Sequence, residues 1–181
     1  MRILNSIISK EECDKLINTC QQKYVEYCSK FVENAYPFRK EINITPWIPI
    51  AGLESLFVTI LKNFPSVDFD MSEGTGIMFS NAHQGEKIPL HFDHPVSLVF
   101  DPQNPHDLTK TRKWKATAVL MLSESGIIMS AKDMVSESTN SNLSAGDIAL
   151  IEDDTLYGFP VNSSSTPIFA LHFVMCSDIT K

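Results

Sequence analysis

The sequence has little positive charge and no long hydrophobic run. It contains 15 Lys and Arg against 22 Asp and Glu, a formal net charge of -7 at pH 7 with neutral histidines. An acidic surface disfavours nucleic acid and anionic membranes as main partners, because both carry negative charge. No window approaches the roughly 18 apolar residues that span a bilayer, so we expect no membrane span. The segment before Cys13 also lacks the apolar stretch and cleavage site of a secretion signal.

Signatures of several common enzyme classes are also absent. The chain contains no G-x-S-x-G, no G-x-G-x-x-G and no P-loop, so serine hydrolase, Rossmann and nucleotide triphosphatase interpretations have no support. None of the cysteines forms a C-x-x-C pair, and we interpret them as reduced, mostly packed thiols. They are Cys13, Cys20, Cys28 and Cys176. Reduced cysteines and the missing secretion signal predict a cytoplasmic protein.

The amino-terminal third is predicted to be helical. Ser9 begins an S-K-E-E segment with Glu12 three residues on, which is the pattern of a capping box. Apolar residues then recur at helical spacing, and we expect a helix over about Lys10–Phe31. A second helix is expected over about Leu53–Asn63, where a broad apolar face ends before Pro65.

From about residue 75 the pattern changes to short apolar or alternating runs separated by turn residues, which is typical of an all-β unit. The expected strands are GIMFSNA, IPLHFDHPVSLVF, KATAVLMLS, GIIMSA, GDIALIE and PIFALHFVM. Two polar segments, Asp101–Thr111 and Ser136–Ser144, are expected as loops. The length and the lack of a linker predict one domain, residues 1–181, with a helical support region at 1–70 and a strand core at 75–178. Packing both helices against one sheet would cover the apolar face of each.

The residues that best suggest chemistry lie in the L-H-F-D-H-P segment, at His91 and Asp93. Residues two apart in a strand point to the same face, so this pair would present an imidazole and a carboxylate to one side. These are two of the three groups in the facial triad that binds non-haem iron(II). The H-x-D pattern alone has low specificity, so its interpretation depends on the motifs around it.

The order of these motifs resembles the prolyl 4-hydroxylase-like branch of the iron(II)/2-oxoglutarate dioxygenases. S-K-E-E-C-D-K-L-I looks like the family's opening helix, A-T-A-V-L-M-L-S resembles a core strand, and S-A-G-D-I-A-L-I-E resembles the strand before the third metal ligand. The resemblance spans nearly the whole chain. It implies an α+β protein built on a double-stranded β-helix of the jelly-roll or cupin-like type. In that fold the N-terminal helices pack on the major sheet.

The third metal ligand of that family is a histidine, and this sequence has none at the matching position. Counting from Gly146 places Tyr157 there, whereas counting back from Pro160 places Leu156 there. The resemblance therefore implies that His91, Asp93 and Tyr157 are the metal-binding and catalytic residues.

The family's 2-oxoglutarate-binding Arg or Lys is missing as well. Its position falls on Thr166 or Pro167, and neither can donate a charge-assisted bidentate hydrogen bond to a carboxylate. Some relatives take this cation from another strand, which favours Lys115 here, with Lys87 as the other choice. We therefore expect Lys115 and Thr166 at the cofactor-binding position.

Three interpretations of the missing histidine remain open. Tyr157 oxygen or a water completes the metal site, His172 substitutes, or the site is catalytically inactive and the fold is kept for binding. His172 lies five or six residues beyond the anion position, roughly 15 Å or more along a strand. Counted from Pro167, it also faces away from the site. We expect His172 to be structural, outside the barrel or against a helix.

The resemblance implies a non-haem iron(II) oxygenase, an oxidoreductase with iron(II) and 2-oxoglutarate as cofactors. The expected reaction is hydroxylation or a related oxidation of a small molecule or a peptide side chain. Two alternatives remain: a degenerate dioxygenase-fold binding protein, and a cupin-like metal enzyme that does not use 2-oxoglutarate. The second alternative would explain the missing Arg, since no dicarboxylate need be held. The sequence leaves the substrate and the oligomeric state open.

Overall fold

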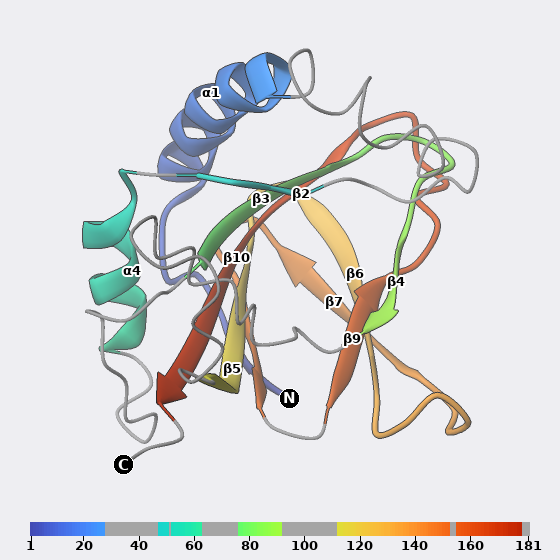
Figure 1. The fold of residues 1–181 in the computed structure, drawn as a ribbon. Helices are drawn as coiled ribbons and strands as arrows, with labels where there is room; N and C mark the ends of the chain where they lie inside the picture. The colour runs from blue at the N-terminus through green and yellow to red at the C-terminus, as the bar shows by residue number, and fades with distance from the viewer. Residues whose placement is uncertain (28–46, 51, 63–75, 92–111, 153–154, 179–181) are drawn as a thin grey trace.

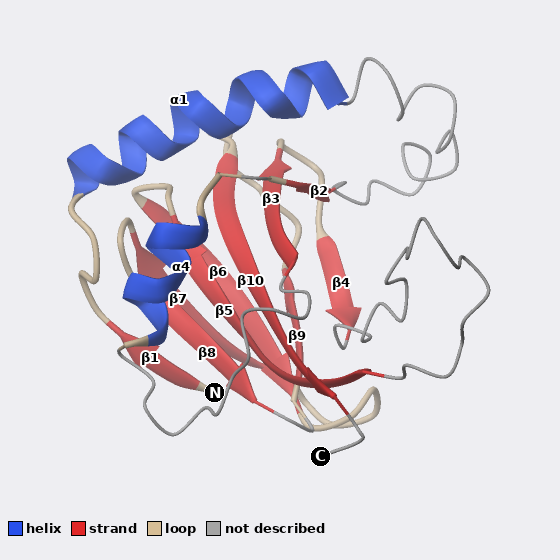
Figure 2. Ribbon diagram, turned by 60° about the vertical axis from the view of Figure 1, so that its left-hand side comes forward, coloured by secondary structure: helices blue, strands red, loops and turns tan. Residues whose placement is uncertain are grey.

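The computed structural model describes residues 1–27, 47–50, 52–62, 76–91, 112–152 and 155–178. Its strands form two antiparallel sheets (Figure 1). The helices of the described residues pack on the outer face of the larger sheet, and the smaller sheet packs on its inner face (Figure 2). This arrangement confirms the expectation that both helices cover one sheet.

Among the described residues, the larger sheet has six strands, with the long apolar strands at its centre. In spatial order they are β1 (Arg2–Leu4), β8 (Ile148–Glu152), β5 (Arg112–Met121), β10 (Ile168–Asp178), β3 (Gly76–Ala82) and β2 (Trp47–Pro49). Strands β5 and β10 pair along most of their length, with Leu120 opposite Leu171. Both faces of this sheet are covered, so its central strands bury mainly apolar side chains on each face.

In the described part of the chain, the smaller sheet has four strands of four to seven residues. In spatial order they are β4 (Ile88–His91), β9 (Leu156–Phe159), β6 (Ser125–Ala131) and β7 (Thr139–Ser144). Its inner side chains, such as Ile128 and Phe159, meet Val119 and Ile151 of the larger sheet in a second apolar core. The space between the two sheets is therefore packed mainly with apolar side chains. A polar group occurs there only where an inward-pointing strand residue is polar.

Helix α1 (Lys10–Tyr27) begins at the predicted capping box. The backbone N–H of Ser9 donates to the Glu12 carboxylate at 2.8 Å, and the Glu12 N–H donates to Ser9 Oγ at 3.2 Å. These two bonds satisfy backbone donors that the first helical turn leaves unpaired. The part of the expected helix beyond Tyr27 lies outside the described residues.

Helix α4 (Glu54–Leu61) matches the second predicted helix to within two residues at each end. Its Phe57 ring stacks on Phe173 of β10, with ring centroids 5.3 Å apart. On α1, Cys13 and Cys20 are buried free thiols, as expected, and burial raises the pKa of each to about 11. Both helices therefore bury an apolar face against the larger sheet. No helix in the described part of the chain is long and apolar enough to cross a membrane.

One loop prediction is wrong. Six residues of the segment expected as a loop at Ser136–Ser144 form strand β7, which pairs with β6 at the edge of the smaller sheet. Most of its side chains are exposed, and only Leu143 is buried. An edge strand with one solvated face needs few apolar residues, so its polar sequence gave no strand signal. The other expected loop, Asp101–Thr111, lies outside the described residues.

Candidate metal site between the two sheets

His91 is the last residue of β4 and lies opposite Tyr157 of β9. The two rings are 4.6 Å apart between centroids and tilted by 41°. His91 is partly buried, and its Nδ1 lies 2.9 Å from the carbonyl oxygen of Pro89. A carbonyl oxygen only accepts, so the Nδ1 hydrogen donates to it and the lone pair of the neutral ring is on Nε2. Ligating histidines commonly carry this kind of hydrogen bond on the nitrogen that does not bind metal.

Strand β4, which carries His91, pairs irregularly with β9, and Gly158 of β9 makes this pairing possible. The register between β4 and β9 shifts between Ile88 and His91. At Gly158 of β9, a Cβ atom would lie 2.5 Å from the Ile88 carbonyl oxygen and 2.8 Å from that of Pro89. Only glycine allows the two backbones to approach this closely. Gly158 therefore sets the path of β4 and, through it, the place of the His91 ring.

Tyr157 projects into the interior between the sheets. Its ring is buried with the second apolar core, and its hydroxyl lies 3.2 Å from Nδ1 of His172. Of the two positions that sequence counting offered for the third ligand, the structure places Tyr157 directly opposite His91, whereas Leu156 pairs with Ala131 of β6. The phenol oxygen is thus brought to the same interior as the His91 imidazole.

The expectation that His172 lies outside the barrel or against a helix is wrong. His172 is buried and contacts Tyr157 and Phe159, with ring centroids 6.0 and 5.7 Å away. Along β10 the side chains alternate: Leu171, Phe173 and Met175 pack in the helix-side core, whereas Ala170 and Val174 join the core between the sheets. His172 shares the parity of the second set, which the count from Pro167 reversed.

Ser80 of β3 completes this polar group and was not singled out from the sequence. Its Oγ lies 2.9 Å from Nε2 of His172 and 3.5 Å from the carbonyl oxygen of Ala170. The signal was present, because Ser80 and its neighbour Asn81 are polar residues inside the mostly apolar strand GIMFSNA. A Ser–His pair suggests a nucleophile, but Ser80 is fully buried in the middle of a paired strand, where no substrate carbonyl can reach it.

The structure describes the other expected site residues only in part. Asp93 lies outside the described residues. Only the backbone of Lys115 is described. Ala116 of β5 lies opposite Met175 of β10, whereas Trp114 lies opposite the next residue, Cys176. Lys115 is therefore the extra residue of a β-bulge. No group of three or more His, Cys, Asp or Glu that could hold a metal ion occurs within the described ranges.

Thr166 is not brought together with His91 and Tyr157. It lies in the β9–β10 loop, where its N–H donates to Ser164 Oγ and its carbonyl accepts from the Asn162 amide. The next strand begins at Ile168, four residues before His172, which is roughly 13 Å along a strand at 3.3 Å per residue. Thr166 therefore belongs to the opposite end of the two sheets.

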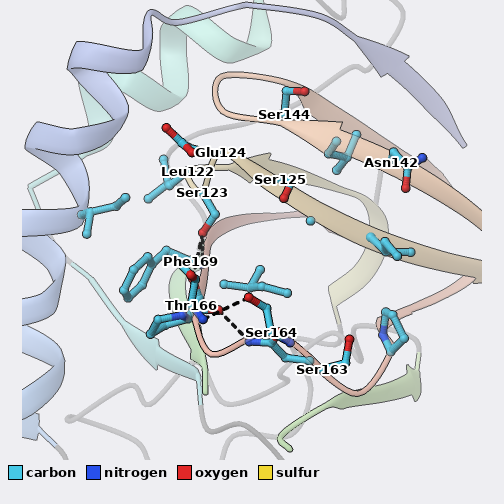
Figure 3. A pocket seen from close by; sticks show the side chains of 18 of the residues that line it. Leu122, Ser123, Glu124, Ser125, Asn142, Ser144, Ser163, Ser164, Thr166 and Phe169 are labelled. Carbon is cyan, nitrogen blue, oxygen red and sulfur yellow. Dashed lines mark hydrogen bonds between the residues drawn. The ribbon is translucent and has the colours of Figure 1, made fainter. Parts of the chain in front are cut away.

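That opposite end holds a cavity of about 600 Å³ (Figure 3). It is lined by the β5–β6 turn, the β9–β10 loop and the first turns of α1, and it carries many hydroxyl and amide groups. Ser123 Oγ accepts from the Phe169 N–H at 2.7 Å and donates to the Pro167 carbonyl at 3.3 Å, which ties the turn to the loop. The cavity is an open recess of the surface, separate from the interior that holds Tyr157.

An exposed ion pair borders this cavity. The Lys10 ammonium donates to the Glu124 carboxylate, which raises the pKa of Lys10 and lowers the pKa of Glu124. Both side chains are largely exposed, so the pair contributes little to stability. It lies at the end of the fold away from His91 and does not act on the candidate metal site.

No protein-family model and no curated protein matches this sequence. Solved structures match its fold. The carbocyclase SnoK from nogalamycin biosynthesis, described as non-haem and α-ketoglutarate dependent, has a TM-score of 0.65 at 12% identity, over 97% of this chain and 78% of SnoK. HygX from Streptomyces hygroscopicus, solved with nickel and 2-oxoglutarate, has a TM-score of 0.60 at 11% identity, over 96% of this chain and 81% of HygX.

A prolyl hydroxylase in complex with a hypoxia inducible factor peptide from Trichoplax adhaerens has a TM-score of 0.61 at 11% identity, over 96% of this chain and 82% of that one. At such low identity the likeness shows the fold. The chain has the mostly antiparallel β-fold of the iron(II)/2-oxoglutarate oxygenases, with helices on the outer face of one sheet.

Proposed function

We propose that this chain is a single-domain, non-haem iron(II) oxygenase built on a double-stranded β-helix. Its reaction would be the 2-oxoglutarate-linked hydroxylation, or a related oxidation, of a small molecule or a peptide side chain. The observation that carries the proposal is the pairing of His91 with Tyr157 across β4 and β9, with the His91 Nδ1 held by the Pro89 carbonyl.

Two of the described residues offer donor atoms of the kind that a divalent metal accepts. His91 offers Nε2, and Tyr157 offers a phenol oxygen in the same interior. Asp93 follows His91 by two residues and would supply a carboxylate, although it lies outside the described residues. One imidazole and two oxygens make a donor set that suits iron(II) or manganese(II), with positions left for further ligands.

The chain itself holds and shields such a metal. His91, Asp93 and Tyr157 would bind it, and apolar neighbours such as Ile88 and Phe159 exclude water from the interior side. A dry surrounding strengthens the electrostatic hold of the protein ligands on a cation. When bound, iron(II) with 2-oxoglutarate supplies the activation of dioxygen, and the protein contributes binding and orientation.

A cation for the far carboxylate of 2-oxoglutarate is needed under this proposal. Lys115 of β5 (Arg112–Met121) is the residue we assign to it, because some members of the resembled family take this cation from a different strand. Thr166 has no part in the proposal, because it lies at the opposite end of β9 and β10.

The solved structures support the class of chemistry. SnoK is described as α-ketoglutarate dependent, HygX holds nickel and 2-oxoglutarate, and the Trichoplax enzyme holds a peptide. The first two favour 2-oxoglutarate as the cofactor, and the third favours a peptide among the substrate classes.

A second candidate function is a binding protein that keeps the fold without catalysis. The observation in its favour is that the residue in place of the third ligand, Tyr157, is buried and engaged by His172. A metal enzyme that does not use 2-oxoglutarate is the remaining alternative. Its support is that Thr166 or Pro167 stands at the position where the resembled family has its 2-oxoglutarate-binding cation, and neither residue carries a charge.

Metal titration and succinate release together separate these functions. The metal-free protein would be titrated with iron(II) and with manganese(II), and succinate would be measured with and without added 2-oxoglutarate. Metal binding with 2-oxoglutarate-dependent succinate supports the oxygenase. Metal binding without succinate favours the enzyme that lacks 2-oxoglutarate, and the absence of any metal binding favours the binding protein.

A further inference from the structure

The cavity at the end of the fold opposite the candidate metal site has walls that hold their own shape. Asn162 of the β9–β10 loop is 4% exposed, and its amide group donates to the carbonyl oxygens of Ala82 and Thr166, both at 3.0 Å. Its side-chain oxygen accepts from the Ser164 N–H at 2.9 Å. Ser123 then ties the β5–β6 turn to the same loop. The recess is therefore formed in advance, as most small-molecule sites are.

A second wall of the cavity is the outer face of the β6–β7 pair. Ser125 lies opposite Ser144, and Ile127 lies opposite Asn142. Paired residues, and residues two apart in a strand, share one face of a sheet. These four side chains therefore lie on the face away from Ile128, which packs in the core between the sheets. The strand alternation thus directs a polar row with one apolar member into the recess.

Several polar groups of the lining have no partner within the protein. In the part of the chain that the structure describes, the side chains of Ser125, Asn142, Ser163 and Thr166 make no hydrogen bond to protein. Ser125 of β6 and Ser163 of the β9–β10 loop lie on opposite sides of the recess (Figure 3). Hydroxyl and amide groups both donate and accept. The lining therefore suits a ligand whose own polar groups do both, as alcohol hydroxyls do.

The charges at the cavity disfavour an anionic ligand. Lys10 and Asp14 share one face of α1 at a spacing of four residues, and Glu124 comes from the β5–β6 turn. The Lys10 ammonium already donates to the Glu124 carboxylate, and the Asp14 carboxylate acts on the same ammonium. Among the described lining residues, one positive charge thus stands against two negative ones. A phosphate or carboxylate would meet like charge there.

Apolar side chains complete the walls. Ile127 and Val161 border the recess and are 38% and 54% exposed, and the half-buried Phe169 also lines it. A sugar ring has the matching character, because its C–H faces are apolar and its hydroxyl edges are polar. The cavity volume of about 600 Å³ lies within the range of small-molecule sites, about 300–1,000 Å³.

We propose that this cavity binds an uncharged saccharide. The free groups of Ser125, Asn142, Ser163 and Thr166 bond the ring hydroxyls, and Ile127 and Val161 contact the C–H face. The inference does not rest on the proposed oxygenase function, because the cavity is separate from the interior that holds Tyr157. A failure of metal binding would leave it untouched.

Sugar titrations of the full chain test the ligand class. The protein, labelled with ¹⁵N, would be titrated with maltose, N-acetylglucosamine, glucosamine and glucose 6-phosphate while its amide NMR signals are recorded. We expect maltose or N-acetylglucosamine to shift signals of the cavity residues in a saturable way. The charged sugars should bind more weakly. If neither neutral sugar binds at millimolar concentration, or if glucosamine or glucose 6-phosphate binds more tightly than both, the proposal is wrong.

Variants of the lining test the location. Asn142→Ala and Ser163→Ala each remove one free group, and each should weaken the sugar by about 2- to 10-fold, as expected for one neutral hydrogen bond. Asn140→Ala is the matched control, since Asn140 is an exposed asparagine of the same strand that does not line the cavity. Its affinity should equal that of the wild type. Ser125→Trp places a large ring in the recess from an exposed position and should abolish binding. Wild-type affinity in Asn142→Ala, Ser163→Ala and Ser125→Trp would show that the sugar binds elsewhere.

Discussion

His91 and Tyr157 face each other across β4 and β9, although 65 residues separate them in the chain. Their rings lie 4.6 Å apart between centroids, at the end of the smaller sheet away from the 600 Å³ cavity. The pairing depends on the register of two four-residue strands. The candidate metal site is therefore defined by strand pairing, and variants that act on either ring or on the register test it directly.

The first prediction concerns the ligands His91 and Asp93. His91→Ala and Asp93→Ala should each remove the rise in melting temperature that iron(II) or manganese(II) produces in the wild type. The physical reason is mass action: a metal at 100 times its dissociation constant stabilises the folded state by about 2.7 kcal/mol, and loss of a ligand removes this term. Differential scanning fluorimetry with and without metal measures the effect.

His83→Ala is the matched control for these variants. His83 is an exposed imidazole in the turn between β3 and β4, where its backbone N–H bonds to Glu86. It should keep the full metal-dependent rise. An equal rise in the wild type, His91→Ala and Asp93→Ala would mean that the metal binds elsewhere on the protein.

The second prediction concerns Gly158, which the site needs for its geometry. A Cβ at this position meets two backbone carbonyls of β4 within 2.8 Å. Gly158→Ala should therefore push β4 away and displace His91, with a stability loss of about 1–3 kcal/mol and weaker manganese binding. Denaturant unfolding and metal titration measure the two effects separately.

Gly146→Ala separates the geometric effect from general destabilisation. Gly146 has a φ of +88°, and its Cβ would lie 2.1 Å from the Ile8 carbonyl, far from β4. The left-handed conformation and the clash should cost about 1–3 kcal/mol or more. Its folded fraction should bind manganese as the wild type does. If Gly146→Ala weakens the metal as much as Gly158→Ala, metal binding follows stability rather than the path of β4.

Sequence patterns predicted the elements that are specified by short-range motifs or by strongly apolar segments. The Ser9–Glu12 capping box and strands β3, β5, β6, β8 and β10 follow from short-range spacing and hydrophobic runs, and all are present. The polar edge strand β7 was missed, because one buried leucine leaves no alternation to detect. The placement of α1 and α4 on the larger sheet followed from their apolar faces.

The site was predictable only in part, since it depends on register. The H-x-D spacing singled out His91, and the motif order singled out Tyr157, which the structure places opposite each other. The face of His172 was predicted wrongly because it was counted from Pro167. Successive residues of a strand point to opposite faces, so a count that begins one residue away reverses the predicted face. Ser80 was not recognised, because its importance comes from His172 two positions along the neighbouring strand, a contact that no local pattern reveals.

The third prediction concerns the pH dependence of the α1 cap. Hydrogen bonds from Ser9, first from its backbone, lower the pKa of Glu12 below its ordinary value of 4.5. A lowered carboxyl pKa in the folded state adds stability above the unfolded value, and this stability is lost as pH falls through the folded value. The melting temperature of the wild type should therefore exceed that of Glu12→Gln at neutral pH, and the difference should vanish in acid. Glu11→Gln is the control, because Glu11 bonds to Lys15 and not to the helix backbone. A constant difference across the acid range would contradict the capping explanation.

The last prediction returns the family histidine to the site. Tyr157→His places a neutral nitrogen opposite His91, and iron(II) favours such a donor over a protonated phenol. Iron(II) affinity should rise by about tenfold or more, equivalent to about 1.4 kcal/mol. The metal-free variant should be less stable by about 1–3 kcal/mol, because a large buried ring and its bond to His172 are lost. For this reason direct titration, rather than melting temperature, is the appropriate measurement.

Tyr157→Phe distinguishes a ligand from a packing residue. It keeps the buried ring but removes the oxygen, so iron affinity should fall below that of the wild type if the oxygen binds metal. Ferric iron should give a visible phenolate charge-transfer band in the wild type and none in either variant. Catalysis need not return in Tyr157→His, because the cation for 2-oxoglutarate depends on Lys115 as well. Identical iron affinities in all three proteins, with no visible band in the wild type, would show that Tyr157 only packs the interior and that the metal interpretation of its position is wrong.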